Sequence, residues 1–333
     1  MVFLRRYTDW TGERKRKKQE GFIPDRDIYF ESSSAEEITV SSFGAFTIAK
    51  VLEERGIRFE WIIDEGGMIM HEPISGVNGT YAMVGMGEKG ASSLRFVAKG
   101  NGGHASAPED DTPLVRLGRF MDEADRMKIF KKELSPVIRE MFKRLSACVG
   151  FPLNIIYGHP DMFHSLLEII MPRLAGTPRA LVQTTIAFTM ADGSDGYNVI
   201  PAEASVVGNM RTSHHQKFKE SCKAISELAA KYNIETEILE EAVDTKLSDF
   251  NSAGFRLIES AVNSCFKDVK TAPYIMTGAS DLRFMDHLAD NCFHFVPFLI
   301  DEAQLESIHG INECVDISTL APAVDFYKTL MRG

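Results

Sequence analysis

Carboxylates follow two short segments of the sequence that are predicted to be β-strands. Glu36 and Glu37 come soon after the segment Asp27–Phe30, and Glu65 follows the segment Ile57–Ile63. Neighbouring residues of an extended chain point to opposite sides, so one glutamate of the pair could bind a metal ion while the other transfers a proton. Glu65 is a further candidate oxygen ligand, followed by glycines that allow close approach of the backbone. A solvated acidic loop or a type II turn would account for the same residues without chemistry.

A histidine near the C-terminus could complete a metal site. His309 lies in the segment Ile308–Glu313, just before the last predicted helix. Two carboxylates and an imidazole at the ends of such elements form a plausible set of zinc ligands. A single histidine near a helix start is also often a cap or a core residue, so both roles stay open for His309. The histidines that match no motif are expected to be structural: His71, His159, His164, His214, His215, His287 and His294.

The elements that must position these residues alternate between strand and helix at both ends of the chain. Strand 27–30, a helix that begins after Ser41 or Ser42, and strand 57–63 form a βαβ unit, which places both acidic clusters where open α/β sheets bind ligands. Helices at 252–266 and 316–331, with short strands at 272–276 and 293–298, give the same pattern near the C-terminus. Both terminal parts are therefore expected to belong to one α/β domain.

The middle of the chain has a different pattern. An alternating strand near 93–98 precedes a glycine-rich turn, and strands at 180–189, 204–212 and 234–242 follow, with helices at 112–145, 161–175 and 216–232. Strands and helices of this kind predict an inserted α+β domain built on an antiparallel sheet. A chain of 333 residues is long enough for two such domains.

Composition excludes several classes of protein. Hydrophobic residues make up 44% and charged residues 25%, as in ordinary globular proteins, and the net charge of −10 opposes binding to nucleic acid or to an anionic membrane. Five cysteines without a CxxC pair predict neither a disulfide framework nor a cysteine zinc site. No apolar run is long enough for a signal peptide or a membrane span, so a cytoplasmic location is the default expectation.

Several short motifs occur in a fixed order from about residue 20 to the C-terminus. They are Glu20–Phe22, Arg26–Phe30, Glu36-Glu37, Ala45, Ile48-Ala49, Leu52, Arg55-Gly56, Asp64–Gly67, Gly102–Ser106, Tyr197–Pro201, Thr277–Arg283 and His309–Glu313. In this order they resemble the zinc metallopeptidase family of aminoacylase, Gly-X carboxypeptidase and glutamate carboxypeptidase. The resemblance implies a split zinc-exopeptidase-like catalytic domain with a mixed sheet (1–90 and 246–333) and an inserted lid or dimerisation domain with a four-stranded antiparallel sheet (91–245).

The resemblance also implies roles for the proposed metal site. Glu36 matches the general base, which takes a proton from the metal-bound water and delivers it to the leaving amine. Glu37 and His309 match ligands of one zinc ion, and Glu65 matches the carboxylate ligand of a second. Cobalt or manganese would suit the same oxygen and nitrogen ligands.

Further matched residues would contact the substrate. His104 matches a histidine that, in dimeric members, reaches the partner's active site and stabilises the tetrahedral oxyanion. Arg211 is a candidate partner for the substrate carboxylate, which a guanidinium can bind with two hydrogen bonds. Asn198 and Gly278 match contacts at the substrate's carbonyl and carboxylate. Turn and surface roles would also explain Asn198 and Arg211.

The N-terminal part of the sequence departs from the family pattern. In the family a His-x-Asp motif and a metal-bridging aspartate precede the glutamate pair, and both would fall at or before the start of this chain. We therefore expect an N-terminally truncated member with reduced metal occupancy and impaired activity. The implied function is metal-dependent hydrolysis of amide bonds in N-acyl amino acids or C-terminal dipeptide-like substrates, by a homodimer. The alternatives are an inactive fragment or paralogue that acts through its dimerisation domain, and a chain whose missing ligands come from an upstream neighbour.

Overall fold

The computed structural model describes residues 2–3, 26–33, 44–126, 129–174 and 176–332. Its contacts divide the chain into two compact units. The first unit comprises Met1–Glu88, Pro136–Phe163 and Lys246–Gly333, and the second comprises Lys89–Ser135 and His164–Thr245. Residues 136–163, which the sequence pattern assigned to the inserted domain, therefore cluster with the first unit.

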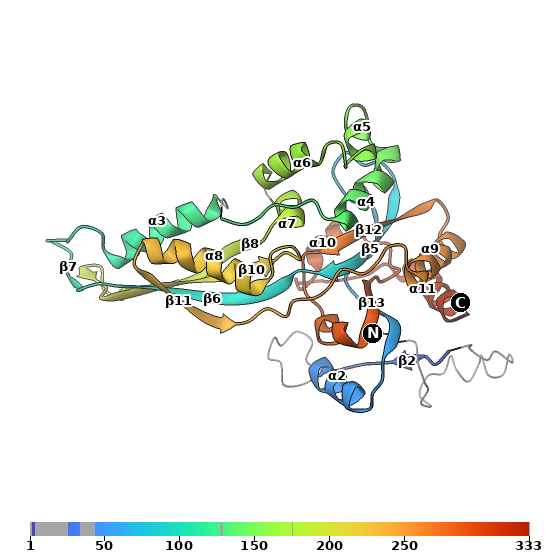
Figure 1. Cartoon of the computed structure of the whole chain (residues 1–333), viewed down its shortest axis with the longest axis horizontal. Coiled ribbons are helices and arrows are strands. Elements are labelled where there is room, and N and C mark those ends of the chain that lie inside the picture. The colour runs from blue at the N-terminus through green and yellow to red at the C-terminus, as the bar shows by residue number, and fades with distance from the viewer. Residues whose placement is uncertain (1, 4–25, 34–43, 127–128, 175, 333) are drawn as a thin grey trace. The chain divides into compact units, whose positions relative to one another are not determined.

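The first unit is built on a seven-stranded mixed sheet, seen in Figure 1. The strand order is β12-β5-β13-β3-β1-β2, and β4 pairs with β5. The strands are β1 (Val2–Phe3), β2 (Tyr29–Phe30), β3 (Phe59–Asp64), β4 (Ile69–His71), β5 (Thr80–Glu88), β12 (Val269–Met276) and β13 (Ala289–His294). Strand β13 runs parallel to β3 and antiparallel to β5, which in turn runs parallel to β12. Buried side chains on both faces of β3, β5 and β13 are typical of strands inside an α/β sheet.

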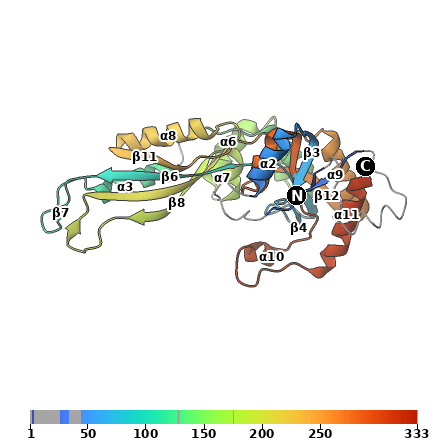
Figure 2. The same cartoon turned by 90° about the horizontal axis from the view of Figure 1, so that it is seen from below.

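The first unit also contains helices. They are α2 (Ala45–Glu54), α4 (Pro136–Leu145), α5 (Leu153–Gly158), α9 (Ala253–Cys265), α10 (Glu302–Ser307) and α11 (Leu320–Arg332), with 3-10 turns at 146–148, 281–284, 286–288 and 317–319. One face of α2 buries Ala45, Ala49 and Leu52 in a core shared with Phe59 and Ile62 of β3. Helices α9 and α11 pack against each other (Figure 2), and α4 packs on β12.

The second unit is built on a four-stranded antiparallel sheet of order β11-β6-β10-β8. These strands are β6 (Gly90–Lys99), β8 (Thr185–Asp192), β10 (Glu203–Thr212) and β11 (Ile234–Glu240). Helices α3 (Pro113–Asp125) and α8 (Phe218–Lys231) contact each other and the sheet, so they cover the same face. Phe96, Phe120 and Phe188 meet in the core between them and the strands.

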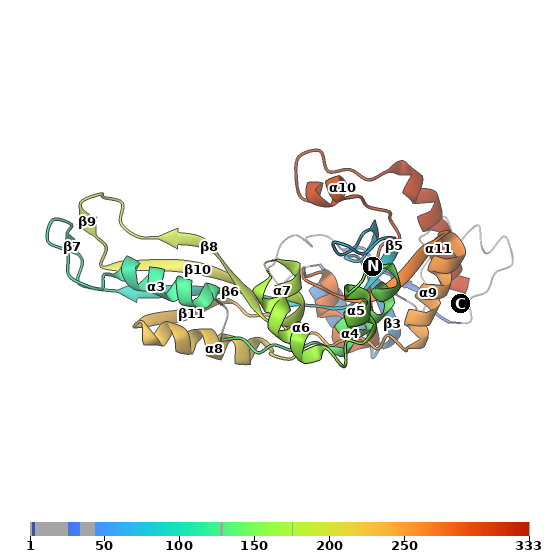
Figure 3. The same cartoon turned by 90° about the horizontal axis from the view of Figure 1, so that it is seen from above.

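Smaller elements complete the second unit. The short strands β7 (Gly103–His104) and β9 (Val199–Ile200) pair beyond one end of the four-stranded sheet, as Figure 3 shows. Helices α6 (His164–Ile170) and α7 (Thr177–Val182), with a 3-10 turn at 171–173, precede β8.

The predicted fold class is confirmed: an α/β part with a mixed sheet accompanies a four-stranded antiparallel sheet. Some predicted elements were wrong. Residues 180–182 end helix α7 instead of beginning a strand, because Pro178 stands in the first helical turn. The helical patterns predicted over 112–145 are observed as α3, which ends at Asp125, and α4, which begins at Pro136. Strands β4 and β5 were not predicted at all.

The capping residues predicted for α2, Ser41 and Ser42, lie outside the described residues, and Gly44 precedes the helix. In the described part of the chain, no helix combines the length and apolarity that crossing a membrane requires.

Candidate functional site

The predicted metal site is only partly visible. Glu36, the predicted general base, and Glu37, a predicted zinc ligand, lie outside the described residues. Glu65 and His309 are described and both are exposed. Within the described ranges, no group of three or more His, Cys, Asp or Glu side chains is arranged to hold a metal ion. The described residues therefore do not form a metal site by themselves, and the roles of Glu65 and His309 as ligands stay predictions.

Glu65 directly follows β3, at the end of a buried strand. Its neighbour Asp64 is buried, and burial raises the pKa of the Asp64 carboxyl above its usual range. Glu65 itself is exposed, while its backbone oxygen lies 3.1 Å from Nδ1 of His294. A carbonyl oxygen only accepts hydrogen bonds, so Nδ1 of His294 carries the proton in this contact. The end of β3 thus buries one carboxyl group and presents the next to solvent.

Gly278 lies in the segment that follows β12, and this segment reaches the same histidine. Gly278 is exposed, and nothing would contact a Cβ atom added there. Two residues later, the Ser280 hydroxyl lies 3.4 Å from Nδ1 of His294, and the Ser280 amide donates to Oε2 of Glu88 over 2.5 Å. Burial raises the pKa of Glu88 to about 8. The structure therefore brings the segments that hold Glu65 and Gly278 together around His294.

More buried carboxyl groups lie beside these segments. Asp281 accepts a hydrogen bond from the Ser33 hydroxyl at 3.0 Å, and Glu31 is buried nearby with a pKa that burial raises. The side chains of Glu31, Asp64 and Glu88 are all buried, and this burial raises the pKa of each carboxyl group.

His309 lies on the excursion between β13 and α11 that carries the short helix α10. The residue has φ 61°, in the left-handed region, and its backbone amide donates to Glu313 over 3.1 Å. A positive φ at a residue other than glycine is uncommon and is often retained at functional sites. Its predicted pairing with Glu37 is untested, because Glu37 is not among the described residues.

His104 and Asn198 are brought together in the second unit. His104 of β7 pairs in register with Val199 of β9, and the amide of Ala105 donates to the Asn198 oxygen over 2.9 Å. The His104 ring accepts from the Ser106 amide at 3.2 Å and lies 2.8 Å from the Ser106 hydroxyl. Both predicted residues are exposed at one end of the unit, as Figure 3 shows for β7 and β9.

Arg211 lies at the other end of the same sheet. It pairs in register with Ala91 of β6 and Thr185 of β8, whereas β10 begins at Glu203, next to Lys99. At about 3.3 Å per residue, the eight steps from Glu203 to Arg211 span about 26 Å. Since β7 and β9 lie beyond the Glu203 end, His104 and Arg211 of one chain are too far apart to contact the same small substrate.

The surroundings of Arg211 are partly buried and positively charged. Its Nε atom donates to Oδ1 of Asn209 at 3.1 Å. Lys89 is buried nearby and donates to the backbone oxygens of Ala180 and Gln183 at 2.9 and 2.6 Å. Burial and then the Arg211 charge lower the pKa of Lys89 to about 7. The Arg211 guanidinium, together with Lys89 when it is protonated, favours the approach of an anion at this end of the sheet.

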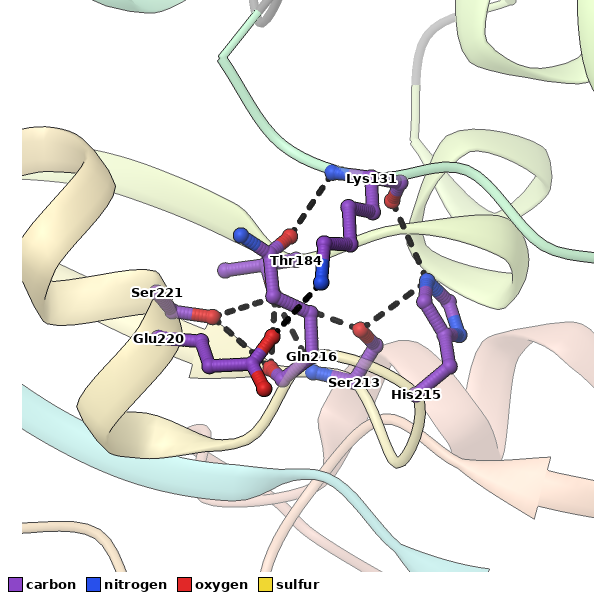
Figure 4. Close-up of polar contacts among 7 residues, drawn as sticks. All are labelled: Lys131, Thr184, Ser213, His215, Gln216, Glu220 and Ser221. Carbon is purple, nitrogen blue, oxygen red and sulfur yellow. Dashed lines mark hydrogen bonds and ion pairs between the residues drawn. The ribbon is translucent and has the colours of Figure 1, made fainter.

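A buried polar network holds the turn that follows Arg211 (Figure 4). Oγ1 of Thr184 accepts from the Ser213 amide at 3.1 Å and lies 3.0 Å from the Ser221 hydroxyl, which donates to the Gln216 oxygen at 2.8 Å. The Gln216 side chain accepts from the Lys131 amide at 2.7 Å. This network ties β8, β10 and α8 together two residues beyond Arg211, so it restricts where the end of β10 can move.

The sequence did not predict the buried residues that contact the predicted site residues or the segments that carry them. His294 matched no motif, and Ser280, Glu88 and Lys89 were not singled out. A glutamate followed directly by a lysine inside an apolar segment was the available signal, because such charges are rarely buried without a partner.

Comparison with known proteins shows which family the chain is similar to. The family model described as a peptidase dimerisation domain, M20_dimer, matches residues 86–237. The chain is 28% identical over 315 residues to the human N-fatty-acyl-amino acid synthase/hydrolase PM20D1, covering 94% of this chain and 62% of that protein. It is 30% identical over 323 residues to the probable carboxypeptidase S-like 2 of Dictyostelium discoideum, covering 94% and 60%. The match over residues 86–237 and the similarity to these relatives support the M20 peptidase family for this chain.

Solved structures of M20 type and related proteins share the fold. The di-peptidase Dug1p of Saccharomyces cerevisiae matches with a TM-score of 0.58 and 12% identity, over 96% of this chain and 68% of that one. The M20 family metallo-carboxypeptidase Sso-CP2 of Sulfolobus solfataricus matches with a TM-score of 0.58 and 14% identity, over 89% and 68%. The chain spans about three fifths of the length of the curated M20 relatives that it matches.

Proposed function

We propose that the protein hydrolyses an amide bond next to a free carboxylate, in an N-acyl amino acid or at the C-terminus of a peptide. The relatives include an N-fatty-acyl-amino acid hydrolase and carboxypeptidase S-like proteins. The substrates that these names imply share one chemical feature, an amide bond one carbon away from a carboxylate. The observation that carries the proposal is the position of Arg211, a partly buried guanidinium at the end of β10 beside a second buried cation, Lys89. This position suits a carboxylate.

The metal site of this proposal combines residues inside and outside the described part. Glu37 and His309 would bind one zinc ion and Glu65 a second, with Glu36 as the general base; cobalt or manganese would suit the same ligands. Bound zinc would polarise the amide carbonyl and activate a water molecule. Because the described residues do not form a three-ligand group, we derive no reaction step through the metal.

The proposed enzyme is a homodimer with shared sites. The matched family model is a dimerisation domain. His104 and Asn198 lie at one end of the second unit and Arg211 at the other, so in each chain they would serve different active sites. His104 would donate a hydrogen bond to the oxyanion in the partner's site, and Asn198 would contact the substrate's carbonyl there.

The alternative is a chain that associates through its dimerisation domain without catalysis. One observation favours it: the family model that matches residues 86–237 is a dimerisation domain. The two functions differ in metal content and in turnover, so both are directly measurable.

The test uses the full chain with a panel of N-acyl amino acids and peptides. We expect bound zinc, turnover that Glu36→Gln abolishes, and an increase in KM for Arg211→Met that exceeds its decrease in kcat. The exposed Arg26→Met serves as a control for loss of positive charge. Mixing inactive His104→Ala and Glu36→Gln chains should restore part of the activity, because one site of each mixed dimer then has both groups. A purified chain that holds no metal and hydrolyses no substrate of the panel would refute the enzyme and leave the alternative.

A further inference from the structure

Every backbone carbonyl of the Asp64–Gly67 segment has a hydrogen-bond donor. Two of these donors are backbone amides: Phe295 donates to the Asp64 oxygen and Val296 to the Gly67 oxygen, both over 2.7 Å. These bonds extend the pairing of β3 with β13 past the end of both strands. They fix the two ends of the segment and leave the middle peptide groups, of Glu65 and Gly66, to other donors.

The two middle carbonyls are held by side chains from distant parts of the sequence. Nδ1 of His294 lies 3.1 Å from the Glu65 oxygen, and the Tyr274 hydroxyl donates to the Gly66 oxygen at 2.9 Å. Glycine at 66 and 67 gives this segment unusual backbone freedom, and Gly66 has φ 116°, which other residues rarely adopt. His294 and Tyr274 therefore each hold one of these two peptide groups through a hydrogen bond to its oxygen.

The His294 ring is itself fixed. It is 1% exposed, and its Nδ1 atom also lies 3.4 Å from the Ser280 hydroxyl. A Cβ atom at Gly85 would lie 2.8 Å from Cβ of His294, and one at Gly67 would overlap the His294 oxygen. The glycines therefore admit the histidine between β5 and the Asp64–Gly67 segment, where close packing leaves its ring little freedom.

We propose that His294 and Tyr274 are positioning residues that hold the Glu65 carboxylate in a fixed orientation, and that His294 also aligns the segment carrying Gly278. The proposal rests on the proposed function, in which Glu65 binds a metal ion and Gly278 contacts the substrate. A carboxylate on a glycine-rich segment binds a metal ion more tightly when hydrogen bonds hold the segment in the binding orientation before the ion arrives. Removing hydrogen-bond partners behind a metal ligand typically weakens metal binding 10–100-fold.

The experiment compares variants of the full chain by hydrogen exchange and by titration with Zn²⁺. His294→Leu and Tyr274→Phe each remove one donor, and His294→Asn keeps an N–H group near the position of Nδ1. Phe293→Leu is the control in β13, since Phe293 is fully buried against Trp61 and Phe255 instead of Glu65. Tyr81→Phe is the control for removal of a hydroxyl, because Tyr81 donates to the Arg144 oxygen.

We expect amide exchange in peptides covering 64–68 to become about tenfold faster in His294→Leu and Tyr274→Phe, while peptides of α9 keep their rate. Peptides covering 277–282 should respond to His294→Leu alone, and His294→Asn should recover part of both effects. Zn²⁺ affinity should fall 10–100-fold in His294→Leu, with both controls close to the unmodified chain.

Unchanged exchange at 64–68 in both variants would overturn the proposal, and so would equal acceleration in Phe293→Leu, which would indicate general loosening of β13. An unmodified chain that neither binds Zn²⁺ nor hydrolyses substrate would refute the proposed function. The exchange measurements would still decide whether His294 and Tyr274 hold the segment.

Discussion

The ammonium group of Lys89 lies 2.6 Å from the backbone oxygen of Gln183. Its only other hydrogen bond in the described residues is to the Ala180 oxygen, so a buried cation is held by neutral carbonyl groups alone. Desolvation of this cation is costly, which is why the pKa of Lys89 is lowered to about 7.

Lys89 should make stability depend on pH above neutrality. Its pKa in the folded protein is about 7 and its ordinary value is 10.5, so between these values the unfolded chain binds a proton that the folded chain does not. Stability therefore rises with pH in this window. Relative to Lys89→Met, the unmodified chain should gain about 2 kcal/mol between pH 6 and pH 9, measured by urea unfolding at each pH.

Lys99→Met provides the control for Lys89. Lys99 is the last residue of β6, the strand that begins directly after Lys89, and its exposed side chain is paired with Glu235, which raises its pKa. Its substitution should shift stability by the same amount at pH 6 and pH 9. A pH-independent difference between Lys89→Met and the unmodified chain would contradict the prediction.

Glu88 should make stability depend on pH in the opposite direction, and at lower pH than Lys89. Burial raises its pKa from 4.5 to about 8, so between these values the folded chain binds the extra proton and stability falls as pH rises. Compared with Glu88→Gln, the unmodified chain should lose about 2–4 kcal/mol between pH 5 and pH 8. The stability of Glu88→Met should likewise not fall between pH 5 and pH 8. This variant should be less stable than Glu88→Gln at every pH, because the Ser280 amide loses its acceptor. Parallel stability profiles for all three proteins would refute this assignment.

Gly67 is expected to tolerate no side chain. A Cβ atom there would overlap the backbone oxygens of Met83 and His294, neither of which can move without breaking the sheet. Gly67→Ala should lower the free energy of unfolding of the first unit by more than about 2 kcal/mol. Gly150 lies in the same unit with open space around it, so Gly150→Ala should change the calorimetric melting temperature only slightly. Equal melting temperatures of the two variants would contradict this prediction and show that the Asp64–Gly67 segment can shift.

Arg144 should stabilise the first unit by joining α4 to α9 and β12. It pairs with Glu140 and Glu259, donates to the Thr271 oxygen at 3.3 Å, and lies over the Phe255 ring at 5.2 Å. Arg144→Met should cost about 2–3 kcal/mol, since partly buried carboxylates and a carbonyl lose their donor. Arg139→Met on the same helix, which breaks a more exposed pair with Asp161, should cost less than about 1 kcal/mol. Chemical denaturation of both variants gives the comparison.

Much of the fold followed from the sequence because its patterns are local. The helix predicted at 252–266 is observed as α9, Ala253–Cys265, with Ser252 as its cap. Strand β5 was missed because its residues Thr80–Glu88 are buried on both faces and contain two glycines, so neither alternation nor strong strand propensity marks it.

The sequence predicted some residues of the candidate site and missed others. Glu65, His104 and Gly278 stand in recognisable motifs, and the structure describes each of them. His294 and Tyr274 reach the Glu65 segment from more than 200 positions away, and a single sequence carries no signal for such a contact. Whether Glu36 and Glu37 complete the site stays a prediction.

The position of β13 in its sheet has a consequence for how the protein is made. This strand, Ala289–His294, lies between β5 and β3, which the ribosome delivers some 200 residues earlier. Until it emerges, the edges of β3 and β5 that face β13 lack their partner and can pair with other nascent chains. The sheet of the first unit is therefore completed late in synthesis, and a chaperone that binds extended apolar segments would meet β3 and β5 before β13.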